Sequence, residues 1–297
     1  MNLTPRNFPV YELIDSGGFE KLERFGTYIL ARPEPQAVWN RSLPEAEWKK
    51  MYHAQFRKNP SNREGNVGQE RGEWILKKDM PEQWVIQYPY RSMQLGLRLG
   101  LTSFGHIGVF PEQAENWNFI FDTIDEIKHE KPVVLNLFAY TGAASLAARA
   151  AGADVHHVDS VKQVVNWARE NMENSRLNGI HWIIEDAMKF VQREVKRGKQ
   201  YHGIILDPPA YGRGPQGEKW LLDRHINEMI SLCSRLLHKR NSFFMLSMYS
   251  LSFSPMISEN LVMNNFKDAG DKDAGELFFP DRAGRKLPLG TFIRFRK

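Results

Sequence analysis

The chain has 297 residues, of which 42% are hydrophobic and 25% charged, and this composition excludes a wholly disordered chain. That length suits one large domain or two ordinary ones. The net charge is +5, and the single cysteine, Cys233, excludes an intrachain disulfide. No apolar run reaches the roughly 18 residues of a membrane span, and no secretory signal pattern opens the chain. We therefore expect a cytoplasmic protein without a membrane segment.

Residues 1–108 alternate short aromatic and β-branched runs with Gly, Pro and Asp, as in YELIDSGG and WVIQYPY. Such runs predict strands and hairpins. Residues 44–57 have helical spacing, and the polar stretch 59–72 predicts a loop. We expect residues 1–108 to form a small β-rich domain for substrate recognition.

After residue 110, apolar strand-like runs alternate with helical patterns. The predicted strands and helices, in chain order, are 111–130 (helix), 133–138 (strand), 143–152 (helix), 154–159 (strand), 161–174 (helix), 181–186 (strand), 187–197 (helix), 202–207 (strand), 219–237 (helix) and 242–248 (strand). Strands alternating with helices favour right-handed crossovers and a parallel sheet covered on both faces. ELFFP and LPLGTFIRFRK predict a closing antiparallel hairpin. Residues 109–297 are thus expected to form an α/β, doubly wound, mostly parallel seven-stranded, Rossmann-like domain.

The end of the chain is basic. Its cations between residues 281 and 297 are Arg282, Arg285, Lys286, Arg294, Arg296 and Lys297. A surface of this kind can meet a polyanion. The alternative is the solvated rim of a hairpin.

In an open α/β sheet, ligands bind beyond the carboxyl ends of the strands. The first such segment is NLFAYTGAAS, in which Gly142 and its small neighbours let the backbone pass close to a ligand. The segment carries only one of the three glycines of a dinucleotide fingerprint, so a pyrophosphate site is disfavoured. A simple turn is the alternative.

Acidic residues follow the next two predicted strands. Asp159 stands where a carboxylate can accept both hydroxyls of a ribose, and Asp186 where an acceptor can take the amine of an adenine beside the apolar Ala187. Both aspartates could instead cap the helices that follow them.

The fourth predicted strand ends in Asp207-Pro208-Pro209, with Tyr211 two residues beyond. Two prolines remove two N–H donors and stiffen the turn, which holds Asp207 and the neighbouring carbonyl groups at the ligand edge. Rigid acceptors there can orient a planar nitrogenous substrate, on which Tyr211 can stack. Gly212, Gly214 and Gly217 predict a mobile lip.

The ordered set NLFAYTGAAS, HVD, EDAM and LDPPAY resembles motifs I to IV of class I S-adenosylmethionine-dependent methyltransferases. More narrowly, it is similar to the RlmI/RlmK-like group of large-subunit rRNA methyltransferases, whose F-x-x-Q segment is matched by residues 110–113. The cofactor-binding residues that this resemblance implies are Gln113, Asn136, Phe138, Tyr140, Thr141, Gly142, Asp159, Asp186, Ala187 and Asp207. The implied catalytic residues are Asp207, Pro208, Pro209 and Tyr211.

One departure from the family limits the chemistry. Relatives that make 5-methylcytosine use a cysteine after the fifth strand, because that carbon needs covalent activation. Here the segment is LSMYS, and Cys233 lies within a predicted helix. Direct transfer to a nucleophilic nitrogen is therefore favoured, with an oxygen as the alternative acceptor. A metal at His156, His157 and Asp159 is disfavoured, because neighbouring strand residues point to opposite faces.

We therefore expect an S-adenosylmethionine-dependent methyltransferase acting on a base nitrogen of RNA, with ribosomal RNA as the leading substrate. The alternatives are methylation of a protein or small molecule, and a non-catalytic nucleotide-binding or RNA-binding module. A nicotinamide enzyme is disfavoured by the missing glycines. The sequence does not define the oligomeric state.

Overall fold

In the computed structural model, which describes residues 1–59, 71–249 and 253–297, the largest sheet has eight strands. Their order is β1-β16-β17-β15-β12-β9-β10-β11. These strands are β1 (Asn2–Leu3), β9 (Val133–Leu137), β10 (Asp154–Asp159), β11 (Ile180–Ile184), β12 (Gly203–Leu206), β15 (Phe243–Met248), β16 (Lys272–Pro280) and β17 (Lys286–Arg296). All neighbouring pairs are parallel except those that β17 forms with β15 and β16.

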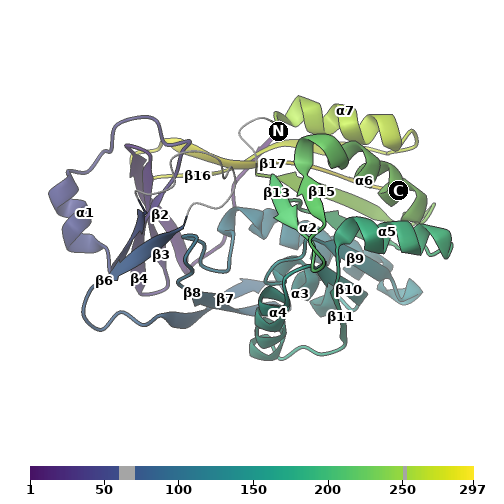
Figure 1. Ribbon diagram of the computed structural model, residues 1–297, viewed down its shortest axis with the longest axis horizontal. Helices are drawn as coiled ribbons and strands as arrows, with labels where there is room; N and C mark the ends of the chain where they lie inside the picture. Colours follow the sequence, from purple (N-terminus) through teal and green to yellow (C-terminus); the bar gives the residue numbers. More distant parts are fainter. Residues whose placement is uncertain (60–70, 250–252) are drawn as a thin grey trace.

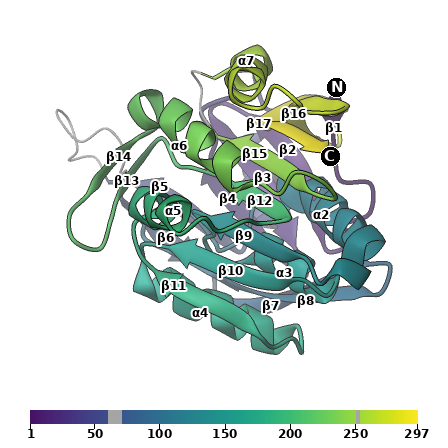
Figure 2. The ribbon, with the colours of Figure 1, turned by 90° about the vertical axis from the view of Figure 1, so that its right-hand side faces the viewer.

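The central strands are apolar because helices cover the sheet on both faces (Figures 1 and 2). On one face, α2 (Ala114–Ile127) and α3 (Ala143–Ala150) pack on residues such as Val134 and Ile205, with α4 (Lys162–Asn174) beside α3. On the other, α5 (Ala187–Lys196), α6 (Leu222–Leu236) and α7 (Pro255–Asn265) pack on residues such as Leu137 and Phe244. The predicted doubly wound α/β architecture is confirmed.

The seven strands predicted for this sheet are all present, and an eighth comes from the start of the chain. Strand β1 pairs with β16, Asn2 opposite Glu276 and Leu3 opposite Leu277. A two-residue strand has too little hydrophobic pattern to be recognised in a sequence. Its pairing partner lies more than 270 residues away.

The β-rich region consists of a five-stranded sheet and a separate hairpin within the described residues. The sheet has the order β2 (Tyr11–Gly17), β3 (Glu20–Phe25), β4 (Tyr28–Pro33), β5 (Ala54–Lys58), β6 (Gly72–Leu76). The hairpin pairs β7 (Gln83–Tyr90) with β8 (Met93–Gly100). Most of the loop predicted over 59–72 lies outside the described residues, and Gly72 belongs to β6.

The helix predicted over 44–57 is wrong in its second half. Helix α1 spans Glu45–Met51 and stops because Tyr52 has an extended backbone. The next residues form β5, which buries Ala54 and Phe56 and pairs with β4 and β6. Partners in two other strands therefore override a local helical spacing.

The region after Asp207 also differs from the prediction. The predicted mobile glycine lip is an antiparallel hairpin of β13 (Tyr211–Arg213) and β14 (Lys219–Leu221). As a result the following helix, α6, begins at Leu222 rather than near residue 219. At the turn, Gly217 has φ 90°, a left-handed conformation that suits glycine.

One hydrophobic cluster is shared by the β-rich region and the large sheet. Phe8, Tyr11 and Phe25 belong to it together with Trp117 and Phe243. The β7–β8 hairpin also docks on α4, since the N–H groups of Gly96 and Arg98 donate to Ser175 (2.9 Å) and Asn171 (2.7 Å). The two regions therefore pack as one body through both apolar and polar contacts.

The basic end of the chain is used inside the molecule. Its ion pairs join Arg282 to Glu12, Arg285 to Asp15 and Asp281, Arg294 to Asp273, Arg296 to Glu126 and Lys297 to Asp268. Lys286 lies over the ring of Phe278. The structure thus favours a hairpin whose cations have intramolecular partners over a free surface for a polyanion. Among the described residues, no helix is both long and apolar enough to cross a membrane.

Arg285 ties the β16–β17 turn to the β-rich region. It lies 2.6 Å from the carboxylate of Asp15 and 2.7 Å from that of Asp281, and it also donates to the carbonyl oxygen of Ser16. The side chains of both acids are almost fully buried. Removal of one partner from a buried ion pair leaves an uncompensated charge.

We expect Arg285→Ala to lower the free energy of unfolding by about 2–4 kcal/mol, because two buried carboxylates lose their cation. Denaturant unfolding of the purified protein measures this change. The matched control is Arg282→Ala, which removes an exposed ion pair to Glu12 and should cost less than about 1 kcal/mol. Equal losses in the two variants would contradict the anchoring role.

Candidate functional site

Four residues from four strands stand together at the carboxyl edge of the large sheet. The register aligns Val158, Leu137, Leu206 and Leu246 across β10, β9, β12 and β15. The residues that follow these positions are Asp159, Phe138, Asp207 and Ser247. Tertiary structure therefore brings the ends of the predicted motifs into one row, as expected for parallel strands.

The loop after β9 has an unusual backbone. Phe138 (φ 55°), Tyr140 (φ 51°) and Gly142 (φ 89°) are all left-handed. For residues other than glycine this conformation costs free energy and persists only where neighbours enforce it. The Asp159 carboxylate enforces it here by accepting the N–H of Tyr140 at 2.9 Å. A backbone in which left-handed residues alternate with ordinary ones is common at ligand sites.

The entry to α3 is held just as tightly. Gly142 occupies the cap position of α3, and a Cβ there would lie 3.0 Å from Ala168. The buried Thr141 donates to the carbonyl oxygen of Gly108 at 2.6 Å, while Asn171 donates to the carbonyl oxygen of Thr141. The segment thus lies between the β-rich region and α4, which leaves little freedom to move.

Asn136 lies beneath this loop and is buried. Its amide donates to Ser145 at 2.9 Å, and the Ser145 hydroxyl lies 3.0 Å from Nδ1 of His157. Burial lowers the pKa of His157 to about 3, so this ring is neutral. Asn136 therefore positions α3, and a direct cofactor contact by its side chain stays a prediction.

Asp159 is only partly buried and does not cap α4, whose cap position is Val161. One carboxylate oxygen accepts the N–H of Val161 and the other that of Tyr140, both at 2.9 Å. Burial raises the pKa of Asp159 despite these bonds. Each oxygen retains lone-pair capacity, which is what a ribose diol requires.

Asp186 does cap a helix. Its carboxylate accepts the N–H of Lys189 at 2.9 Å at the start of α5, where Ala187 is buried. Capping uses only part of the acceptor capacity of Asp186, and the remaining lone pairs can accept the amine of an adenine. The preceding Glu185 pairs with Arg193.

Asp207 is the least satisfied carboxylate of the edge. Among the residues that the structure describes, none donates a hydrogen bond to it or forms an ion pair with it. Asp207 is partly buried, and this burial alone raises its pKa to about 7. Pro208 is buried and Pro209 is exposed, so the stiff turn places an unpartnered acceptor where the chain returns to solvent.

Tyr211 lies on the β13–β14 hairpin directly after this turn. It is partly exposed, and its hydroxyl accepts from Arg213 at 2.7 Å. Trp220 in the facing strand donates to the carbonyl oxygen of Pro209 at 2.7 Å, which holds the hairpin on the proline turn. The Tyr211 ring therefore stands beside the edge that carries Asp207.

Gln113 reaches the same edge from the segment before α2. Its Oε1 accepts from Asn116 at 2.8 Å and from Ser247 at 3.1 Å. Ser247 follows Leu246, the register partner of Leu206, so Gln113 contacts β15, the strand beside the one that leads to Asp207. The structure thus brings the predicted entry residue to the predicted site.

Sequence reasoning missed two acids near this edge. Glu34, buried in the β-rich region, accepts from the hydroxyl of Tyr249 at 3.1 Å, one residue past the end of β15. Glu112 is also buried, and burial raises its pKa to about 7. Glu34 and Tyr249 are separated by 215 residues, so no local pattern could have paired them.

The structure also shows the surroundings of Cys233 and of the two histidines of β10. Cys233 is fully buried in α6, and burial raises the pKa of its thiol to about 12, so it cannot act as a nucleophile near neutral pH. His157 faces Ser145 of α3, whereas His156 lies near Tyr201. His156, His157 and Asp159 therefore do not converge on one point.

These groups fit a charged adenosine nucleoside. The Asp159 carboxylate has capacity for a ribose, the strained loop brings backbone close to a ligand, and Asp207 is a rigid, unsatisfied acceptor. The row of strand ends that carries them suits a ligand bound across the switch point of the sheet.

Comparisons with known proteins agree with this geometry. The family model described as Conserved hypothetical protein 95 matches residues 109–231. The crystal structure of a SAM-dependent methyltransferase from Agrobacterium tumefaciens is 35% identical, with a TM-score of 0.89, over 100% of this chain and 93% of that one. A candidate methyltransferase complexed with SAH shares the fold at 17% identity and a TM-score of 0.71, over 96% of this chain and 75% of its own.

Curated relatives match a shorter stretch. The ribosomal RNA large subunit methyltransferase K/L of Shewanella frigidimarina is 31% identical over 144 residues, which is 47% of this chain and 19% of the relative. This chain thus spans about a fifth of the length of that relative.

The raised pKa of Asp207 makes stability depend on pH. Between about pH 4 and pH 7 the folded protein retains a proton on Asp207 that the unfolded chain has lost, so this group lowers the free energy of unfolding as pH rises. Asp207→Asn should match the wild type near pH 4 and exceed it by on the order of 1–3 kcal/mol at pH 8. Denaturant unfolding across this range measures the difference.

The control for this series is Asp223→Asn, which changes an exposed aspartate in the first turn of α6. Its difference from the wild type should not grow between pH 4 and pH 8. A difference for Asp207→Asn that is equally flat would show that the Asp207 carboxyl is not held in a desolvated site.

Proposed function

The chain belongs to the S-adenosylmethionine-dependent methyltransferases, and we propose that it transfers the methyl group of this cofactor to a base nitrogen of RNA, with ribosomal RNA as the substrate. Family membership rests on the 35% identical structure that the chain matches over its whole length. The observation that supports nitrogen transfer is the unpartnered Asp207 carboxylate behind the proline turn.

We propose that the cofactor lies along the row of strand ends. Asp159 accepts from the ribose hydroxyls, Asp186 and Ala187 receive the adenine, and the loop from Phe138 to Gly142 lines the methionine part. Gln113 closes the site from the α2 side, supported by its bond to Ser247. Asn136 acts through Ser145 by holding α3 in place.

The cofactor supplies an electrophilic methyl group, so the protein has mainly to align the acceptor and offset charge. The Asp207 carboxylate accepts an N–H of the incoming base and offsets the positive charge that develops on its nitrogen. The stiff Pro208-Pro209 turn keeps that acceptor in place, and the Tyr211 ring stacks on the base. With a pKa near 7, Asp207 can also take the released proton.

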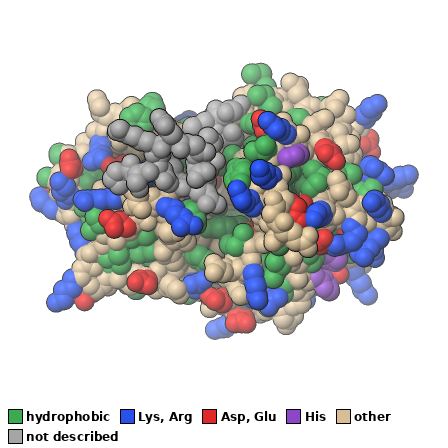
Figure 3. Space-filling model, viewed as in Figure 1, with side chains coloured by type: hydrophobic (Ala, Val, Ile, Leu, Met, Phe, Trp, Pro, Cys, Tyr) green, Lys and Arg blue, Asp and Glu red, His purple; other side chains and the backbone are tan. Residues whose placement is uncertain are grey.

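The β13–β14 hairpin supports a nucleic-acid substrate. Arg213 and Lys219 face each other across it and are exposed, and neither forms an ion pair with a described residue. Figure 3 shows Lys and Arg side chains on both halves of the face that also carries this hairpin in Figure 1. Unpaired cations on a hairpin that follows the Asp207 turn suit phosphates on either side of an extruded base.

Residues 1–108 would then form the substrate-recognition domain, with residues 109–297 as the methyltransferase domain. The hydrogen bond from Tyr249 to Glu34 supports this assignment, since it brings the β-rich region to the edge of the site. The match of the family model from residue 109 supports the boundary. A methyltransferase with an RNA substrate is expected to work in the cytoplasm.

The direct test is transfer of tritiated methyl groups from S-adenosylmethionine to ribosomal RNA isolated from a strain that lacks the gene. We expect labelled RNA with the wild type, and a kcat about 100-fold to 1000-fold lower with Asp207→Ala, because a charge-stabilising acceptor is lost. Cofactor affinity, measured by calorimetry, should fall far less than kcat, because Asp159, Asp186 and the loop from Phe138 to Gly142 still hold the nucleoside. If label appeared only in protein or small molecules, one of these and not RNA would be the substrate. Unchanged turnover in Asp207→Ala would contradict the catalytic role of Asp207.

A second prediction concerns the hairpin. Arg213→Gln/Lys219→Gln should weaken RNA binding and reduce the salt dependence of log K by roughly 2, since two phosphate contacts are lost. The control is Lys239→Gln/Arg240→Gln, which removes two exposed cations before β15, at the opposite edge of the sheet. Filter binding at several salt concentrations compares the two, and equal effects would exclude a specific role for the hairpin.

A further inference from the structure

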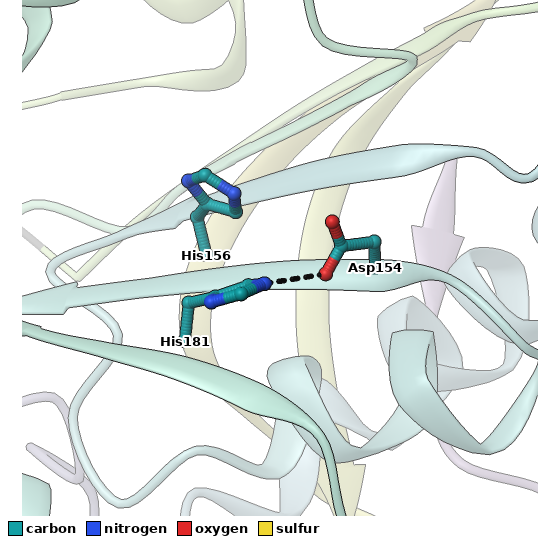
Figure 4. A group of neighbouring side chains, drawn as sticks. All are labelled: Asp154, His156 and His181. Carbon is teal, nitrogen blue, oxygen red and sulfur yellow. Dashed lines mark ion pairs between the residues drawn. The ribbon is translucent and has the colours of Figure 1, made fainter.

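A second group of polar side chains lies at the other end of the sheet from the strand ends described above. Asp154, His156 and His181 project from neighbouring strands β10 and β11 toward one another (Figure 4). One ligand atom from each lies within 4.8 Å of the others, and Nε2 of His181 is 2.9 Å from the carboxylate of Asp154.

Strand geometry explains why these three converge. Asp154 and His156 are two residues apart on β10 and so share a face, and His156 is paired in register with His181 on β11. The imidazole centroids of the two histidines are 4.9 Å apart. His157 and Asp159, which stand beside His156 in the sequence, point elsewhere, and the pairing of His156 with His181 depends on the register of β11, which is not visible in a sequence.

A neighbouring tyrosine orients the buried side of the group. The Tyr201 hydroxyl donates to Glu194 at 3.0 Å, so toward His156, whose Nδ1 is 3.5 Å away, it can only accept. The tautomer of His156 that suits this arrangement has its proton on Nδ1, which leaves the lone pair of Nε2 free. A tautomer selected by a polar partner is the usual arrangement for a histidine that ligates a metal.

We propose that Asp154, His156 and His181 bind a divalent transition-metal ion, for which zinc is the natural probe. Two imidazole nitrogens and one carboxylate oxygen form a standard donor set for this ion. In a tetrahedral site with metal–ligand bonds of about 2.0 Å, the ligand atoms lie about 3.3 Å apart. Side-chain rotation therefore has to shorten the longest distance between two ligand atoms by only about 1.5 Å. The exposure of Asp154 and His181 leaves the fourth position to water.

The site is structural in this proposal. Asp154 and Asp159 are the first and last residues of β10, so roughly 16 Å of strand separates the metal from the cofactor edge. Strand β11 is the outermost strand of the sheet, and a bound ion would cross-link it to β10. Edge strands have unpaired backbone groups on one side, so such a link would stabilise this end of the sheet.

The test is calorimetric titration of the full metal-stripped chain with zinc chloride, together with thermal unfolding. We expect one ion bound per chain and a rise in Tm of roughly 5 °C at a hundredfold excess over Kd. Asp154→Asn, His156→Ala and His181→Ala should each weaken binding by more than about 100-fold and remove the shift, because each deletes a ligand. Tyr201→Phe should weaken it about 10-fold by releasing the His156 tautomer.

The matched control is His129→Ala, which removes an exposed histidine 3.7 Å from the carboxylate of Glu130 and should leave both readouts unchanged. The zinc-induced shift of each variant is measured from its own metal-free Tm, and the exposure of His181 makes His181→Ala the variant least disturbing to the fold. The proposal would be overturned if the wild type bound no zinc. It would also be overturned if His156→Ala/His181→Ala still bound one zinc per chain, and the stacked pair His202 and His238 would then be the next site to test.

Discussion

A carboxylate withdrawn from bulk water needs a donor, a cation or a proton, and Asp207 has neither of the first two among the described residues. Burial therefore holds its pKa near 7. The chain stabilises this unfavourable arrangement with the surrounding sheet: β12 is flanked by β9 and β15, and two prolines prevent the turn from relaxing. A carboxylate that has no donor in the free protein can accept a hydrogen bond from a substrate. The other residues of the candidate site lie around this carboxylate.

The loop from Phe138 to Gly142 carries a comparable cost. Asp159 holds the left-handed Tyr140 through its N–H, and Thr141 is tied to Gly108 and Asn171 from outside the sheet. The β-rich region thus contacts the 138–142 loop through Gly108 and the end of β15 through Glu34. Because the hydrophobic cluster is also continuous between the two regions, the site depends on both.

The two ends of the large sheet have different characters. Its carboxyl edge presents strained backbone and carboxylates that can accept further hydrogen bonds, and such groups suit ligand binding and catalysis. Its amino edge, at β10 and β11, presents the group of Asp154, His156 and His181, which suits stability. The cations at the end of the chain belong to neither function, since their intramolecular ion pairs join the closing hairpin to the rest of the molecule.

Sequence patterns were enough to predict the seven main strands of the large sheet, helices α2 to α6 and the turn at Asp207, because hydrophobic periodicity and proline act over a few residues. They did not reveal helix α7, the β13–β14 hairpin or the strand at residues 54–58. Nor could they show that Arg285 pairs with Asp15 or that Glu34 meets Tyr249, since each of these contacts depends on a partner far away along the chain. The same holds for His181, which reaches His156 only through the register of two strands.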